Sequence, residues 1–84
     1  MYDTHYHYSY TDLGGRVRSV TTRSKRYALD DIAMECLLDP KQRRQLRSDH
    51  RVSYLLPLGG VGHAEILQCS DDCLKRFGVR YRVD

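Results

Sequence analysis

The sequence predicts an α+β fold, a small antiparallel sheet of about five strands with helices packed mainly on one face. Three observations support this prediction. Stretches of alternating polarity occur in both halves of the chain, and a stretch with helical periodicity separates them. Glycine-rich turns join neighbouring alternating stretches. The expected order is ββααββαβ, in a single domain of residues 1–84.

The first hairpin is predicted from residues 2–11, in which tyrosines occupy one parity and histidines the other: Tyr2, Tyr6, Tyr8 and Tyr10 against His5 and His7. Paired glycines at 14 and 15 supply the turn. Residues 16–23 form the return strand. Val17 and Val20 differ in parity there, so we expect either a bulge or a strand with two half-buried faces.

A helix is predicted next, because the apolar residues fall on one helical face: Leu29, Ile32, Ala33, Cys36 and Leu37. Asp30 and Asp31 are expected near its N-terminus, where the helix dipole favours carboxylates. We expect Ile32, Cys36 and Leu37 to be buried against the sheet.

A second helix, from about Pro40 to Ser48, is predicted from a start signal. Asp39 can cap it, Pro40 suits the first helical position, and Gln42 can complete a capping box. Its one apolar anchor is Leu46. The remainder of this helix is basic and polar.

A second hairpin and a final αβ unit complete the predicted fold. Residues 50–58 alternate, with one apolar side formed by Val52, Tyr54, Leu56 and Leu58. A glycine-rich turn leads to a return strand at residues 63–69. Ser70 is then expected to cap a short helix that stops at Gly78, and residues 79–83 to form the last strand.

The basic residues suggest a contact surface. Eleven of the fourteen are arginines, and the net charge is only +3. Arginine grips carboxylates and phosphates bidentately and stacks on flat rings. We therefore expect binding residues among two arginine sets and the first strand: Arg16, Arg18, Arg80 and Arg82; Arg43, Arg44 and Arg47; and Tyr6, Tyr8, His5 and His7.

Each of these features also has a structural interpretation. The tyrosines either form a stacking platform or cover the core, in which case His5 and His7 face outwards beside the arginines. The basic helix is a solvated face, a clamp for phosphates or carboxylates, or the second helix of a DNA-reading helix-turn-helix.

No catalytic motif is present, and we expect neither a cofactor nor a metal ion. The glycines at 59, 60 and 62 precede a strand, which indicates a hairpin turn and not a phosphate loop. Cys36 is expected in the core. The spacing of Cys69 and Cys73 is unusual for zinc, so a zinc or thiol enzyme is the least favoured alternative.

The sequence thus predicts a cytoplasmic, non-enzymatic protein that binds an acidic surface of a larger protein, such as a component of a nucleic-acid-handling complex. In size and composition it is similar to small phage-encoded inhibitors of host-defence enzymes, a likeness without a shared motif. The alternative is direct RNA or DNA binding by the same basic face. No stretch could span a membrane, and the oligomeric state is left open.

Overall fold

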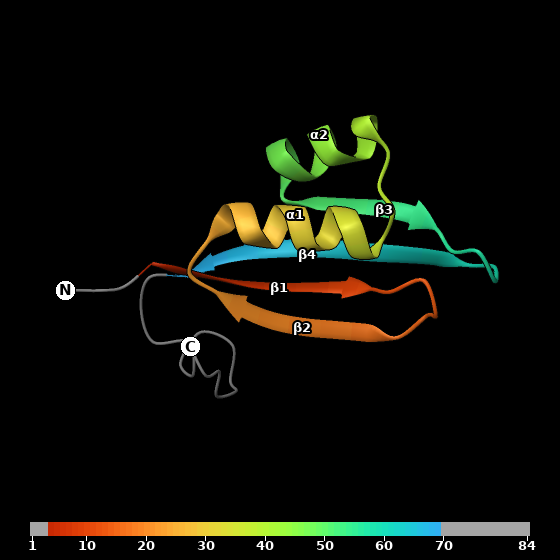
Figure 1. Cartoon of the computed structure of the whole chain (residues 1–84), viewed down its shortest axis with the longest axis horizontal. Helices are drawn as coiled ribbons and strands as arrows, with labels where there is room; N and C mark the ends of the chain where they lie inside the picture. Colours follow the sequence, from red (N-terminus) through yellow and green to blue (C-terminus); the bar gives the residue numbers. More distant parts are fainter. Residues whose placement is uncertain (1–3, 70–84) are drawn as a thin grey trace.

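A computed structural model of the chain describes residues 4–69, which form an α+β fold of one antiparallel sheet and two helices (Figure 1). The strand order in the sheet is β2-β1-β4-β3, so the first and last described strands are neighbours. The elements are β1 (His5–Thr11), β2 (Val17–Thr22), α1 (Lys25–Glu35), α2 (Pro40–Asp49), β3 (Arg51–Leu55) and β4 (Val61–Cys69).

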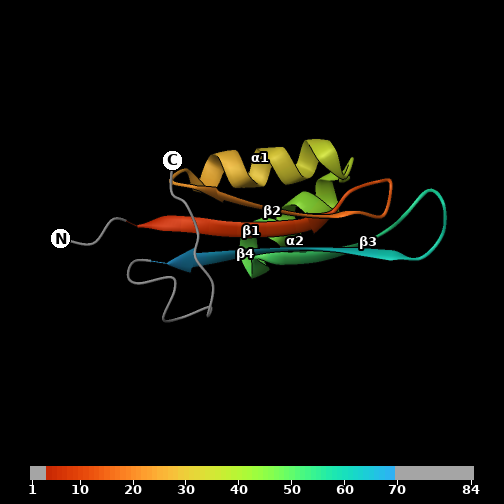
Figure 2. The ribbon, with the colours of Figure 1, turned by 90° about the horizontal axis from the view of Figure 1, so that it is seen from below.

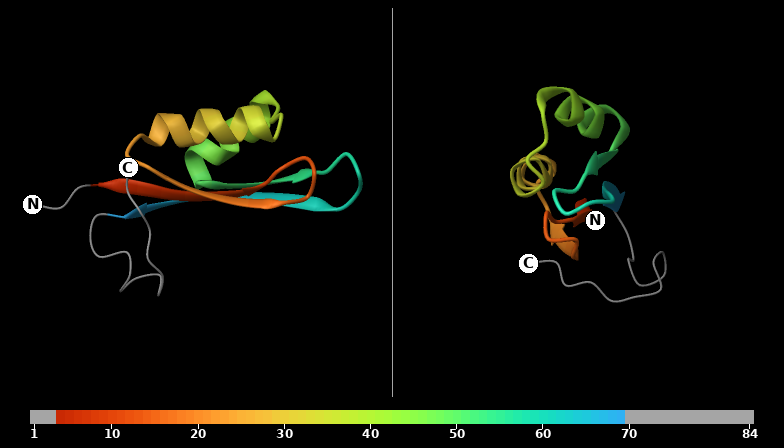
Figure 3. Two further views of the ribbon diagram at one scale, coloured as in Figure 1. Left: turned by 60° about the horizontal axis from the view of Figure 1, so that its bottom comes forward. Right: turned by 90° about the vertical axis from the view of Figure 1, so that its right-hand side faces the viewer.

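Both helices lie on the same side of the sheet (Figures 2 and 3). Successive strand residues point to opposite faces, so the register divides the side chains between two faces. The face under the helices, here called the helix face, carries the strand part of the core: Tyr8, Tyr10, Val52, Tyr54, Ala64 and Ile66. The other face, here called the opposite face, carries the histidines of β1 and alternate residues of β4.

The pairing of β1 with β2 is continuous from Tyr6 opposite Thr22 to Thr11 opposite Val17. No bulge interrupts it. The alternative of two half-buried faces fits only the second half of β2, because its first three residues are exposed and its last three are half-buried. Val17 is exposed and Val20 packs against the core.

Helix α1 begins earlier than expected. Ser24 caps it by accepting a hydrogen bond from the backbone N–H of Tyr27, so Asp30 and Asp31 lie in the second turn. Ala28 and Ile32 are completely buried against the sheet. Cys36, at the C-cap, is also buried, as predicted.

The burial predicted for Leu37 is wrong. Leu37 takes a left-handed conformation (φ 52°) and its side chain is 73% exposed. The N–H of Leu38 bonds to the carbonyl of Ala33 and that of Leu37 to Met34, the pattern of a Schellman motif. This reversal brings Leu38, instead of Leu37, into the core.

Helix α2 confirms the predicted start. Asp39 accepts a hydrogen bond from the N–H of Gln42, and the Gln42 side chain accepts one from the N–H of Asp39. Pro40 occupies the first turn. Leu46 is the one buried apolar residue of the helix, which packs against β3.

In the second hairpin, β3 is shorter than predicted and β4 begins two residues earlier than predicted, at Val61. Val52 and Tyr54 are buried, but β3 ends at Leu55, and Leu58 is 88% exposed in the turn. A Cβ at Gly62 would lie 2.5 Å from the Tyr54 ring, so this β4 position accepts only glycine without rearrangement.

The predicted third helix and fifth strand fall in residues 70–83, outside the described residues. Within residues 4–69, neither helix has the length and apolar character needed to cross a membrane.

Candidate functional site

The exposed side of α2 is the first candidate surface. Lys41, Arg44 and Arg47 follow one another at intervals of three, and we call these three residues the α2 basic stripe. All three side chains are exposed, and none makes an ion pair or hydrogen bond with the part of the chain that the structure describes. The fold therefore leaves three cations available to a partner.

Arg43 differs from its neighbours on α2. Its Nε donates a hydrogen bond of 3.1 Å to the carbonyl oxygen of Leu38, in the connection between the helices. This contact orients the Arg43 side chain and gives a hydrogen-bond donor to a backbone carbonyl of the connection between the helices. Arg43, predicted as a binding residue, therefore has a structural contact as well.

Arg16 and Arg18 lie at the far end of the β1–β2 hairpin. The Arg18 side chain is on the helix face and pairs with Asp12 at 3.2 Å. The Asp12 carboxylate also accepts hydrogen bonds from the N–H groups of Gly14 and Arg16. The backbone bond from Arg16 and then the Arg18 side chain lower the pKa of Asp12, so Arg18 has a local partner.

The two predicted arginine sets are therefore not equivalent. Arg16 and Arg18 belong to the β2 edge of the sheet, whereas α2 covers β3 at the other edge. Arg80 and Arg82 lie outside the described residues. Of the expected basic strand set, the described chain contains Arg16 and Arg18, both exposed, and Arg18 is ion-paired with Asp12.

The tyrosine ladder belongs to the core. Tyr8 is 2% exposed, and its hydroxyl donates a hydrogen bond of 2.6 Å to Asp31 on α1. Burial and this bond raise the pKa of Tyr8 far above that of free tyrosine. Tyr10 is buried, and Tyr6 is half-buried against the core. This burial agrees with the interpretation that the tyrosines cover the core. It weighs against contact between Tyr8 and a partner.

His5 and His7 do not face outwards as expected, since they are only 6% and 5% exposed. Their Nε2 atoms lie 3.0 Å apart, and the Nδ1 atom of His7 lies 2.9 Å from the hydroxyl of Thr21. Burial lowers the pKa of His7, and the adjacent His5 lowers it further, so the neutral ring is favoured. The burial of both rings weighs against direct contact with a partner, and their role in binding stays a prediction.

Cys69 lies next to these two histidines, a proximity that we did not predict from the sequence. It is opposite His5 in the register of β4 with β1, and it is 1% exposed. The ligand atoms of His5, His7 and Cys69 all lie within 4.8 Å of one another. The available signal was the His-x-His pattern on one strand face together with a cysteine at a strand end.

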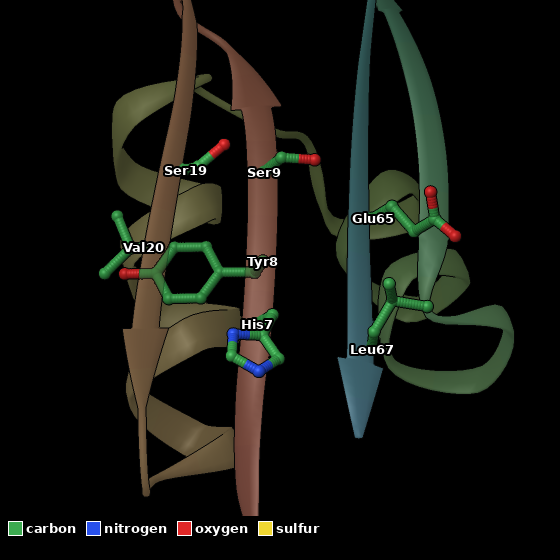
Figure 4. A pocket seen from close by; sticks show the side chains of 7 residues that line it. All are labelled: His7, Tyr8, Ser9, Ser19, Val20, Glu65 and Leu67. Atoms are coloured by element: carbon green, nitrogen blue, oxygen red, sulfur yellow. The ribbon is translucent and has the colours of Figure 1, made fainter. Parts of the chain in front are cut away.

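A shallow hollow of about 100 Å³ lies beside this cluster on the opposite face (Figure 4). Its polar side chains come from three strands, with the helices behind them: His7 and Ser9 from β1, Ser19 from β2 and Glu65 from β4. Pockets for small-molecule ligands usually measure about 300–1,000 Å³. The hollow is too small to enclose such a ligand.

One serine–histidine pair also lies on the opposite face. Ser53 Oγ and His63 Nδ1 are 3.0 Å apart on paired positions of β3 and β4. Both residues are exposed, and within residues 4–69 no carboxylate bonds to the His63 ring. A nucleophilic serine needs a base that a third group orients, so this pair is a cross-strand polar contact.

Comparison of the chain with protein-family models, with curated proteins and with solved structures gives no match.

Proposed function

We propose that this is a binding protein that uses the α2 basic stripe to contact an acidic surface of a larger protein. The observation that carries the proposal is the exposure of Lys41, Arg44 and Arg47 without partners among the described residues. Arginine at such positions can form bidentate bonds with carboxylates on a partner.

The stability of the helix does not account for this stripe. Like charges three residues apart destabilise a helix by a few tenths of a kcal/mol per pair. Helix α2 is instead held by its capping box and by Leu46, on the side away from the stripe. The helix dipole disfavours the Lys41 cation in the first turn and favours the Arg47 cation in the last turn, so it does not explain the three cations together, whereas a role in binding would.

The burial of the tyrosines favours a protein partner over a nucleic acid. Sequence-tolerant binding of single strands combines a basic groove with exposed aromatic rings. In the described chain, Tyr27 is the one tyrosine classed as exposed, at 55%, and it belongs to α1. Binding of RNA or DNA phosphates by the same stripe is the second candidate, supported by the arginine content of α2.

The proposal is tested by capture from a lysate of the native source, with and without nuclease. The double variant Arg44→Ala/Arg47→Ala is compared with Arg16→Ala/Arg26→Ala, which removes the same charge outside α2. We expect a nuclease-resistant partner that the α2 variant loses and the control retains. A partner that binds both variants equally would contradict the proposal.

Salt separates the two candidate partners. Phosphate binding through several cations weakens by orders of magnitude between about 50 and 200 mM salt. A packed protein interface loses far less. Capture that needs nucleic acid and collapses over this salt range would support the second candidate and overturn the first.

A further inference from the structure

The pairing of β1 with β4 gathers three metal-binding side chains on the opposite face. His5 and His7 are two residues apart on β1 and therefore point the same way. Cys69 is directly across from His5 on β4. Residues separated by more than sixty positions in the sequence thus share one buried site at the end of the two central strands.

The three donors match one class of ion. Two imidazole nitrogens and a thiolate sulfur are the ligands that zinc prefers, whereas calcium and magnesium take oxygen ligands. His5, His7 and Cys69 lie on the opposite face of the sheet, and all three are buried. Two neutral nitrogens and one anionic sulfur, all buried, are therefore a donor set suited to zinc.

Thr21 prepares His7 for this role. The Thr21 hydroxyl lies 2.9 Å from Nδ1 of His7, on the neighbouring strand β2. When Nδ1 of His7 carries the proton and donates a hydrogen bond to this hydroxyl, Nε2 of His7 has the lone pair and faces Nε2 of His5. Metal-bound histidines commonly use their second nitrogen in this way.

The separations are close to those that zinc requires. Tetrahedral zinc with bonds of about 2.0–2.1 Å to nitrogen and 2.3 Å to sulfur holds two nitrogens about 3.3 Å apart, and nitrogen and sulfur about 3.6 Å apart. The two Nε2 atoms are 3.0 Å apart. All three ligand atoms lie within 4.8 Å of one another, so zinc binding would require the side chains to draw together to the separations given above.

We propose that His5, His7 and Cys69 bind one zinc ion, which fastens the start of β1 to the end of β4. On binding, the Cys69 thiol releases its proton to solvent and its sulfur bonds to zinc. The rings bind as neutral imidazoles, with the proton of His5 on Nδ1. Three protein ligands leave one position of a tetrahedral ion for a further ligand.

The first test uses the 84-residue chain, purified without a histidine tag. Metal analysis after gel filtration should give about one zinc per chain. Cobalt added to the chelator-treated protein should produce the visible bands of a tetrahedral ion and a near-ultraviolet band from thiolate to cobalt. A folded protein without stoichiometric zinc and without these cobalt bands would overturn the proposal.

Matched variants locate the ion. His7→Gln and Cys69→Ser should each lose zinc, and Cys69→Ser should also lose the thiolate band. His63→Gln, an exposed histidine on the same face, and Cys36→Ser, a cysteine in the core, should retain both signals. Zinc that is lost equally from ligand and control variants, or retained by both ligand variants, would contradict the assignment.

Folding of the variants does not confound the result. Circular dichroism of each variant shows whether it is folded. If a variant unfolds, the cobalt spectrum of the parent still tests the proposal. Zinc should raise the melting temperature of the parent because it binds only the folded site. A chelator that removes zinc without shifting the melting temperature would contradict the proposed fastening of β1 to β4. These readouts are independent of binding by α2.

Discussion

Helix α1 buries Ala28 and Ile32 completely and holds Asp31 against the Tyr8 hydroxyl, whereas α2 buries only Leu46 and turns its cations outwards. The two helices are consecutive, similar in length and on the same face of the sheet. Their difference shows that position over a sheet does not determine how much a helix contributes to the core. We expect substitutions in α1 to act on stability and substitutions in the α2 stripe to act on binding.

The largest effect on stability is expected from Ile32→Ala. Removing this completely buried side chain leaves a cavity between α1 and the sheet, at a cost of about 2–4 kcal/mol. This is a large part of the roughly 5 kcal/mol available to a domain of this size. Urea unfolding measures it, with the exposed Met34→Ala as control. Equal destabilisation by both variants would show that α1 is placed incorrectly.

A smaller effect is expected from Tyr8→Phe. It removes the 2.6 Å hydrogen bond to Asp31, at a cost of about 1–2 kcal/mol. Because folding raises the pKa of Tyr8, its contribution is present below pH 10.0, the ordinary tyrosine pKa, and is lost as the pH rises above it. Unfolding at increasing pH should therefore show a shallower loss for Tyr8→Phe than for the parent. An identical profile would contradict the raised pKa that burial and the bond to Asp31 give Tyr8, and an unchanged free energy of unfolding at neutral pH would contradict the role of the bond.

Leu37→Gly should increase stability. A left-handed conformation costs a residue with a side chain about 1–2 kcal/mol, and glycine avoids most of this cost. The gain is expected to be about 0.5–1 kcal/mol, because the exposed side chain loses little packing. Thermal unfolding measures the change. Destabilisation by more than about 1 kcal/mol would indicate that Leu37 is buried, as its helical periodicity predicted, and would contradict its exposed position.

Arg44→Ala combined with Arg47→Ala should change the free energy of unfolding by less than about 0.5 kcal/mol. Both side chains are exposed, and substitutions at such positions have small effects. Urea unfolding of the variant against the parent measures this. A loss above about 1 kcal/mol would mean that the stripe supports the helix.

Local patterns predicted much of the fold. The capping box at Asp39 and Gln42 acts within one turn, so the start of α2 was recognisable from the sequence. Alternation likewise separated Tyr8 from His7. The end of α1 was not recognisable, because no glycine marks the left-handed position that Leu37 occupies.

The buried histidine–cysteine cluster depends on contacts that local patterns do not contain. Its formation requires β4 to pair with β1 and His5 to be opposite Cys69. Neither the strand order nor the register follows from the sequence of one strand. The grouping of the arginines also depends on the strand order. The order places β2 at one edge of the sheet and β3, under α2, at the other, and local sequence patterns do not contain this information.

The most direct test of the division into a stabilising α1 and a binding α2 is the affinity of the captured partner, measured by titration calorimetry. Three proteins are compared: the parent, Arg44→Ala/Arg47→Ala and the control Arg16→Ala/Arg26→Ala. Two charge-assisted contacts contribute about 1.5–3 kcal/mol each, so the α2 variant should bind at least about 100-fold more weakly while its unfolding curve stays that of the parent. The control should bind within a few-fold of the parent. Parent-like affinity in the α2 variant would show that the stripe is only a solvated face.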